Sequence, residues 1–328
     1  MRRFVSVRLI RYHRLRLQKS TSILFDSTGR VRSGWRAAVF LFVFALISIG
    51  FNVVGQIAVT AVNVDAHSRT MLYLIVGSGL SLIPAILIGW LCGKVFENLP
   101  FRAIGAAFTS GWFKHLVLGG LIGSVTLSFA ALIAFAFGGL RFSYDEIAGT
   151  NAIITSLGLS FVVFAVAAAF EEALFRGYLL QTFSRSGLAW LAILLTSVFF
   201  GAVHHGNPNA GFISTLNTIL AGIWFSVAYL KTRDLWFVWG MHLMWNWMQG
   251  SFFGIEVSGL TDITTAPLFR EIDTGPIWLT GQTYGIEGGI VCTIALIVST
   301  AVIYFLPLAK PDNEMKKLTT KPLPSATG

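Results

Sequence analysis

Long apolar runs recur along the 328 residues of this chain, and they limit what it can fold into. Runs of about 18 or more apolar residues follow one another without a long polar insert, and each is long enough to cross the hydrocarbon core of a bilayer. Only 12% of the residues are charged, about half the share that is usual in soluble domains. Such a chain cannot cover the surface of a water-soluble fold of this size. The sequence therefore predicts an all-α, polytopic membrane helix bundle.

The bundle is predicted to occupy residues 37–307, between two polar ends. Residues 1–36 form a basic arm, and residues 308–328 form a polar tail that we expect to be disordered from Pro311 onward. About eight transmembrane helices are expected, at residues 37–61, 71–93, 115–138, 153–181, 188–205, 210–230, 235–254 and 286–307.

Positive charge is concentrated in the arm, where ten of the 24 lysine and arginine residues lie. A basic arm can indicate nucleic acid binding, but this one directly precedes a hydrophobic span. We therefore interpret it as a flank that is attracted to anionic lipid headgroups, and we expect no nucleic acid partner. The apolar stretch that follows is too long for a signal peptide.

The charges of the predicted loops indicate an orientation. If the N-terminus is cytoplasmic, the segments on that side hold ten lysine and arginine residues besides the arm, whereas the outside loops hold only Arg69, Arg141 and Arg270. Lysine and arginine favour the cytoplasmic side of a membrane. The sequence thus predicts a multi-pass protein of the plasma (inner) membrane with both termini in the cytoplasm.

The fourth predicted span carries two adjacent carboxylates, Glu171 and Glu172, and an arginine, Arg176. A charge at the centre of a membrane helix costs roughly 2.5–3.5 kcal/mol on insertion scales. Glu172 and Arg176 are four residues apart and share a helix face, so they can form an ion pair. Glu171 is rotated by about 100° and can face a cavity. The alternative is a structural ion-pair network that joins two helices.

His204 ends the fifth predicted span, 33 residues after Glu171. The midpoint between the two residues falls between Gly187 and Leu188, in the predicted turn, so an antiparallel hairpin places them at a similar depth. A carboxylate and an imidazole at the same level can polarise one water molecule as a general base pair. The alternative is a histidine that only bonds across two helices.

The seventh predicted span carries His242 and Asn246, which are four residues apart and share a helix face. Both side chains can donate hydrogen bonds, and donors aimed at one point are what a tetrahedral oxyanion needs. Hydrogen bonding between helices is again the alternative.

In a simple bundle, the four candidate residues would not lie at the same depth in the membrane. Glu171 and His204 each lie about 16 residues, or roughly 24 Å, from their turn, whereas His242 lies only eight residues after Asp234. For all four groups to meet, either the hairpin of spans four and five projects into the cytoplasm or span seven begins below the membrane surface.

Taken together, these residues resemble a known family. The motifs Glu171-Glu172-x-x-x-Arg176, Phe200-x-x-x-His204 and His242-x-x-x-Asn246 resemble the signature motifs of the CPBP family, over about residues 150–250. These are the CAAX-protease and bacteriocin-processing membrane proteins, which include the Rce1-type prenyl protease.

The resemblance implies an intramembrane endopeptidase that acts on membrane-anchored or prenylated (CAAX-type) proteins. In that family pattern Glu171 and His204 activate a water molecule, and His242 and Asn246 hold the oxyanion. Glu172 and Arg176 are supporting residues. A non-catalytic membrane scaffold or a bacteriocin self-immunity protein is the alternative, because an intact site is necessary for proteolysis but not sufficient.

A zinc site is also considered, because Glu171, His204 and His242 have the types of a two-histidine, one-carboxylate ligand set. The chain has no His-Glu-x-x-His motif and offers no obvious carboxylate partner for the histidines. The sequence therefore favours a glutamate mechanism without a cofactor.

The predicted topology can be tested with reporter fusions after Lys231 and after Lys316. Both fusions should report the cytoplasm, because both follow an even number of spans and lie in positively charged segments. A signal from the opposite side at either position would rule out the eight-span arrangement.

Overall fold

The computed structural model describes residues 22–26, 29–144, 148–261 and 263–320. Most of the predicted basic arm and the last eight residues of the predicted tail lie outside these ranges.

Each predicted span forms a helix, and the polytopic helical membrane bundle is confirmed. Among the described residues, five helices are long and apolar enough to cross a membrane, and α7 and α11 are shorter apolar helices. The main helices are α2 (Ser33–Thr60), α3 (Ala66–Glu97), α4 (Trp112–Ala136), α5 (Thr150–Glu172), α7 (Ala189–His204), α8 (Phe212–Thr232), α9 (Leu235–Trp247) and α11 (Ile290–Phe305).

Shorter elements extend or connect these helices. The helix that starts as α5 runs without a break to Arg185 through a π-helical stretch, and α9 is extended by a second π-helix. Wide turns of this kind occur frequently at functional sites. The remaining elements are η1 (Phe101–Ile104), η2 (Ala173–Leu179), α6 (Leu180–Arg185), η3 (Met248–Phe252), α10 (Ile277–Thr280), η4 (Gln282–Tyr284), η5 (Ile286–Gly288), α12 (Asn313–Thr320) and the strands β1 (Leu140–Tyr144) and β2 (Phe269–Asp273).

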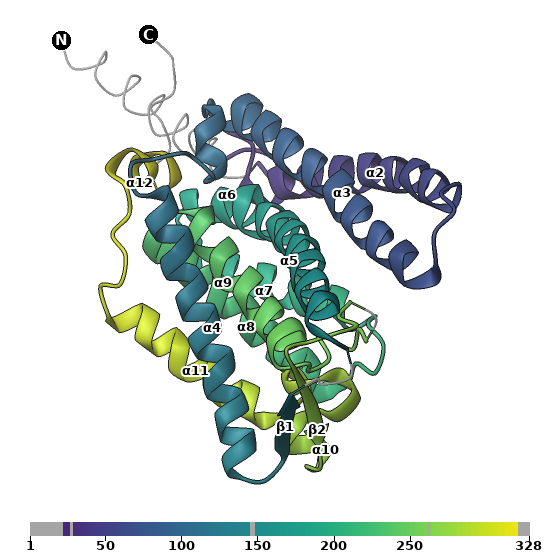
Figure 1. Cartoon of the computed structure of the whole chain (residues 1–328). Coiled ribbons are helices and arrows are strands. Elements are labelled where there is room, and N and C mark those ends of the chain that lie inside the picture. The colour runs from purple at the N-terminus through teal and green to yellow at the C-terminus, as the bar shows by residue number, and fades with distance from the viewer. Residues whose placement is uncertain (1–21, 27–28, 145–147, 262, 321–328) are drawn as a thin grey trace, which may run out of the picture.

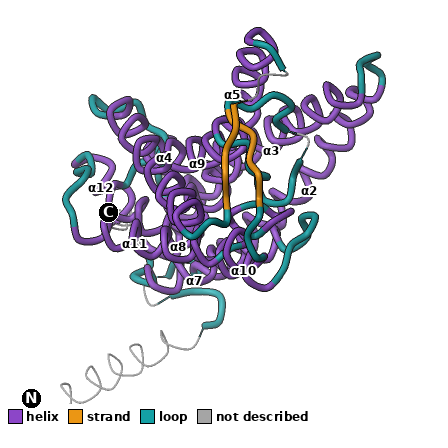
Figure 2. Tube along the Cα trace, turned by 60° about the horizontal axis from the view of Figure 1, so that its bottom comes forward, coloured by secondary structure: helices purple, strands orange, loops and turns teal. Residues whose placement is uncertain are grey.

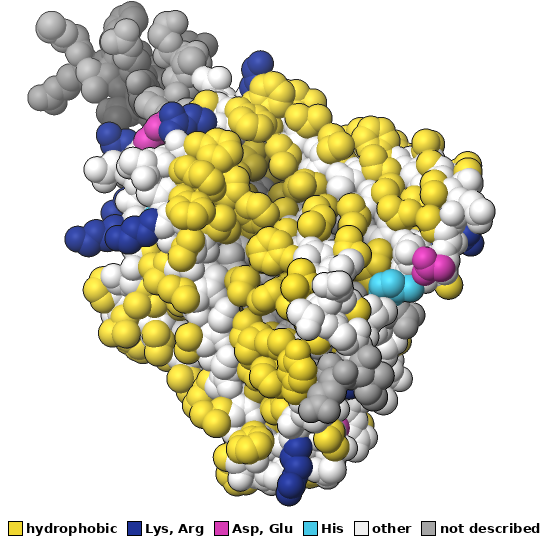
Figure 3. Space-filling view, in the orientation of Figure 1, with side chains coloured by type: hydrophobic (Ala, Val, Ile, Leu, Met, Phe, Trp, Pro, Cys, Tyr) yellow, Lys and Arg dark blue, Asp and Glu magenta, His cyan; other side chains and the backbone are white. Residues whose placement is uncertain are grey.

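The outer surface of the bundle is apolar. Figure 3 shows hydrophobic side chains over most of one face, with charged side chains near its ends. Large apolar side chains such as Phe42 (71% exposed) and Val125 (66% exposed) point outward from α2 and α4. Contiguous apolar surface of this extent is unfavourable in water and suits contact with lipid.

The helices pack most closely between α4 and α9. A Cβ atom on Gly119 would lie 2.0 Å from the carbonyl oxygen of Phe237, and one on Gly123 would lie 2.2 Å from that of Met241. Small residues let the backbones of membrane helices approach each other. Because Met241 faces α4, the next residue, His242, is rotated by about 100° towards the interior of the bundle.

The start of α9 is buried within the bundle. Asp234, which caps this helix, is only 6% exposed. Its carboxylate lies 2.7 Å from Nδ1 of His115, and the next backbone N–H, that of Leu235, donates to the carbonyl of Gly105. Helix α9 therefore begins inside the bundle, beneath the connection between α3 and α4.

The predicted disorder of the tail is wrong for residues 313–320. These residues form α12, whose Met315 and Leu318 are buried against Leu99, Ala103 and Ala107. The two apolar side chains are three positions apart, so they share one face of the helix. The tail folds because the connection between α3 and α4 offers that face an apolar surface.

A two-stranded sheet, which the sequence analysis did not expect, lies at the end of the bundle opposite α12 (Figures 1 and 2). Strands β1 and β2 are antiparallel, with Leu140 opposite Asp273. The sheet joins the segment after α4 to the long connection between α9 and α11. Figure 1 also shows that α2 and α3 form a hairpin that leans away from the other helices.

The strand β2 carries a glutamate, Glu271, whose environment predicts a pH-dependent stability. Burial, together with the nearby carboxylates of Glu256 and Asp273, raises the pKa of Glu271 to about 8. The folded state therefore binds this proton more tightly than the unfolded state. Its stabilising contribution is complete below the ordinary glutamate pKa, about 4.3, and is lost as the pH rises through about 8.

We expect Glu271→Gln to raise the melting temperature of the protein more at about pH 9 than at about pH 4. Thermal unfolding of the purified protein in detergent measures the difference. Glu314→Gln, which alters a half-exposed carboxylate on α12, serves as the control. An equal effect of Glu271→Gln at the two pH values would contradict the assigned environment.

Candidate active site

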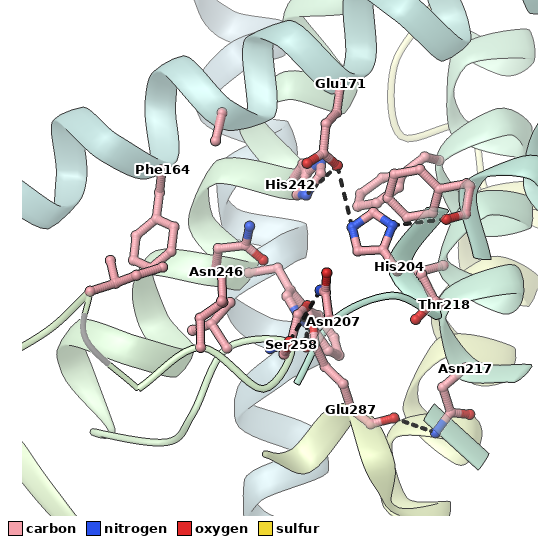
Figure 4. Close-up of a pocket in the computed structure, with 18 of the residues that line it drawn as sticks. Phe164, Glu171, His204, Asn207, Asn217, Thr218, His242, Asn246, Ser258 and Glu287 are labelled. Atoms are coloured by element: carbon pink, nitrogen blue, oxygen red, sulfur yellow. Dashed lines mark hydrogen bonds and ion pairs between the residues drawn. The ribbon is translucent and has the colours of Figure 1, made fainter. Parts of the chain in front are cut away.

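The adjacent residues Glu171 and Glu172 end α5 and point in different directions. Glu171 faces a cavity of about 210 Å³ inside the bundle (Figure 4). Glu172 is 1% exposed, and its Oε1 lies 3.1 Å from a guanidinium nitrogen of Arg176. The predicted ion pair and the predicted separation of the two carboxylates are both confirmed.

The ion pair connects α5 to the neighbouring helices. Arg176 is 0% exposed and donates a second hydrogen bond, 3.0 Å long, to the carbonyl of Gly222 on α8. Its guanidinium carbon also lies 4.9 Å from the ring centre of Phe200 and 5.1 Å from that of Phe225. Aromatic faces attract a cation within about 6 Å, so rings from α7 and α8 help to hold this charge.

The same carboxylate also orients His242. Oε1 of Glu172 lies 2.9 Å from Nδ1 of His242 on α9. The expectation that the histidines lack a carboxylate partner is therefore wrong, because the partner comes from a different helix and is recognised only once the helices are packed. A carboxylate accepts a hydrogen bond from Nδ1–H, so Nε2 is the nitrogen of His242 that faces the cavity.

His204 is oriented by its own helix. Its Nδ1 lies 2.8 Å from the backbone carbonyl oxygen of Phe200, one turn earlier on α7. A carbonyl can only accept, so Nδ1 carries a proton and Nε2 is left to face Glu171. The predicted approach of Glu171 and His204 across the hairpin is confirmed by a distance of 3.8 Å between Oε2 and Nε2.

Both histidines converge on one carboxylate oxygen. Oε2 of Glu171 lies 3.8 Å from Nε2 of His204 and 3.8 Å from Nε2 of His242. This oxygen is buried and has no hydrogen-bond partner within the described part of the chain. A separation of 3.8 Å is too long for a direct hydrogen bond. A water molecule can bridge polar atoms that lie more than about 3.5 Å apart.

Asn246 lines the same cavity, one helical turn after His242 (Figure 4). The structure thus brings together all four residues that the sequence analysis selected as catalytic candidates. They come from three helices, α5, α7 and α9, and they line one cavity.

The far end of the cavity contains polar residues that the sequence analysis did not select. Glu287 accepts hydrogen bonds from the backbone N–H and the hydroxyl of Ser258, both 2.7 Å, and from the indole of Trp245, 3.1 Å. Asn207 and Asn217 lie on the same side (Figure 4). The sequence did contain a signal for Glu287, because it is a carboxylate at the start of the last predicted span.

The side-chain types for a metal site are present, but their arrangement does not match one. In the described residues, no group of three or more histidine, cysteine, aspartate or glutamate side chains is arranged to hold a metal ion. The two imidazoles do have the hydrogen-bonded Nδ1 atoms that metal-binding histidines usually show. These partners also serve to orient an imidazole that acts without a metal.

The buried ion pair predicts a large effect of Glu172 on stability. Glu172→Gln leaves Arg176 buried without its counter-charge, and breaking a buried pair costs about 3–5 kcal/mol. We expect a clearly lower melting temperature, and a partial recovery when Arg176→Met is added. Glu171→Gln is the matched control, since Glu171 contacts no arginine or lysine in the described residues. Equal melting temperatures for the two glutamine variants would disprove this role.

Comparison with known proteins agrees with the three motifs. Residues 153–248 match the family model described as type II CAAX prenyl endopeptidase Rce1-like. This range contains all six residues of the candidate site and its supporting ion pair. A search of curated proteins found no match. Over residues 153–248 the chain is therefore similar to the Rce1-like family of CAAX proteases.

Proposed function

We propose that this protein is an intramembrane endopeptidase that hydrolyses a peptide bond of membrane-anchored or prenylated proteins with a water molecule activated by Glu171 and His204. The observation that carries the proposal is the convergence of two imidazoles on Oε2 of Glu171, each at 3.8 Å, beside a cavity within the bundle. The match to the Rce1-like family supports a CAAX-type protease at the level of the family.

The proposed first step is the attack of water on the carbonyl carbon of the substrate. Glu171 accepts a proton from the water, and Nε2 of His204 accepts its second hydrogen bond and thereby orients it. A bond forms between the water oxygen and the carbonyl carbon, and the electron pair of the C=O π bond moves to the oxygen. The product of this step is a tetrahedral oxyanion.

His242 and Asn246 are the proposed donors to the oxyanion. Nδ1 of His242 donates to Glu172, so Nε2 points into the cavity, where it can donate to the oxyanion when the imidazole carries a proton on both nitrogens. The amide of Asn246 lies one turn further on the same face. Preorganised donors of this kind stabilise the charge that develops on the carbonyl oxygen. In the second step the C–N bond breaks, and Glu171 returns its proton to the leaving amine.

This proposal predicts that Glu171→Gln abolishes cleavage without unfolding the protein. Removal of the general base should lower kcat by about 10²–10⁴-fold, measured with a farnesylated CAAX peptide and with an unmodified membrane-anchored peptide. His204→Gln should have a comparable effect. The control is His205→Gln, because His205 bonds to Thr215 outside the cavity and should retain activity. Folded variants of Glu171 and His204 that cleave normally would favour the scaffold alternative.

The glutamate mechanism also predicts how the enzyme responds to metal removal. We expect the purified protein to contain less than one zinc per chain, and its cleavage rate to be unchanged by a chelator, because Glu171 itself supplies the base. Elemental analysis and the peptide assay measure the two quantities. About one zinc per chain that is lost in His204→Ala would establish the metallo-type mechanism instead.

A further inference from the structure

Phe225 of α8 is an apolar residue that lies beside His242 in the wall of the catalytic cavity. It is only 2% exposed. The centre of its ring lies 4.7 Å from the centre of the His242 imidazole, and the planes of the two rings differ by 25°. A stacked aromatic pair has its ring centres about 4.5–7 Å apart. The cavity wall therefore presents an aromatic face to the imidazole that is the proposed donor to the oxyanion.

The position of Phe225 is fixed by contacts of its own helix. The carbonyl of Gly222, three residues earlier on α8, accepts a hydrogen bond of 3.0 Å from Arg176. A Cβ atom on Gly222 would lie 2.7 Å from Cα of Ser197, so α8 approaches α7 closely at this level. Residues that are three apart lie on the same side of a helix. These contacts therefore hold Phe225 on the side of α8 that faces Arg176 and His242.

Phe225 also contacts the cation that shares a carboxylate with His242. The guanidinium carbon of Arg176 lies 5.1 Å from the centre of the Phe225 ring. Oε1 of Glu172 lies 3.1 Å from a nitrogen of Arg176 and 2.9 Å from Nδ1 of His242. One carboxylate oxygen thus accepts hydrogen bonds from a guanidinium and from an imidazole, and one aromatic ring contacts both of these groups.

The protonation state that His242 needs gives this ring a chemical role. Nδ1 donates to Glu172, so Nε2 can donate to the oxyanion only when the imidazole carries two protons and a positive charge. Glu171 lies 3.8 Å from Nε2, but its carboxylate becomes neutral when it takes the proton of the water molecule. Arg176 is a second cation on the carboxylate of Glu172. The negative face of an aromatic ring attracts a cation within about 6 Å, most strongly where water is excluded.

We propose that Phe225 is a positioning residue for His242. Its ring holds the plane of the imidazole and stabilises the doubly protonated form that donates to the oxyanion. This inference rests on the proposed proteolytic function, because it concerns the step in which the oxyanion forms. It assigns a role in that step to a residue of α8, a helix that supplies none of the four candidate catalytic residues.

The test replaces Phe225 by phenylalanine analogues that carry one, two or three fluorine atoms on the ring. Fluorine withdraws electrons from the ring and weakens its negative face with little change in shape. We expect kcat for the farnesylated CAAX peptide to fall with each added fluorine, by about tenfold for the trifluorinated ring. KM should stay at its wild-type value, because the affected interaction strengthens only as the oxyanion forms.

An ordinary substitution provides a second measurement. Phe225→Leu fills much of the same space without an aromatic face and should also lower kcat by about tenfold. The matched control is the same fluorination of Phe40, a ring that is 0% exposed and packs against Tyr178 away from the cavity. It should leave kcat unchanged. Melting temperatures of all variants show how much of each change is a loss of folded protein.

Equal kcat values for all the fluorinated rings at position 225 would overturn this inference and leave the proteolytic function in place. A wild-type kcat in Phe225→Leu would do the same. A fall in kcat that follows the melting temperature instead of the number of fluorine atoms would show that Phe225 only packs the wall. Normal cleavage by a folded Glu171→Gln variant would instead remove the function on which the inference rests.

Discussion

A charge inside a membrane protein must be neutralised where it lies, and the pair of Glu172 and Arg176 is the place where this requirement organises the structure. The pair is nearly completely buried, and each partner makes a second contact on another helix: Arg176 with the carbonyl of Gly222 and Glu172 with Nδ1 of His242. Three helices are thereby fixed in relation to one another. The arrangement of the site depends on this pair, because the imidazole that enters the cavity is held by the same carboxylate that neutralises the arginine.

The pair also explains why two glutamates follow one another in a membrane helix. Adjacent residues on an α-helix differ by about 100° in direction, so one carboxylate reaches the interhelical contact while the other reaches the cavity. Glu171 is left with an oxygen that contacts two imidazoles at 3.8 Å and has no direct hydrogen bond in the described residues. A buried carboxylate oxygen in this condition needs a partner, and the water molecule of the proposed mechanism would supply it.

Local spacing in the sequence was sufficient to predict the spans, the i, i+4 ion pair and the facing positions of Glu171 and His204, because each depends on one helix or one hairpin. The contacts that it did not predict join distant segments. The bond between Glu172 and His242 spans 70 residues, and the buried start of α9 depends on a carbonyl of Gly105. The prediction of a disordered tail was wrong for the same reason. Met315 and Leu318 of α12 pack against Leu99, Ala103 and Ala107, which belong to a distant part of the chain.

The cavity is lined by residues from inside and from outside the range that matches the Rce1-like family. Its reactive groups, from Glu171 to Asn246, lie within residues 153–248, the range that matches the Rce1-like family. Its far wall contains Ser258 and Glu287, which lie outside that range and are joined by two hydrogen bonds of 2.7 Å. In the proposed mechanism the four candidate residues act on the peptide bond, which is the same in every substrate, whereas side chains of a substrate would contact the walls. In this chain the shape of that far wall depends on how Glu287 holds the segment around Ser258, which lies apart from the four candidate catalytic residues.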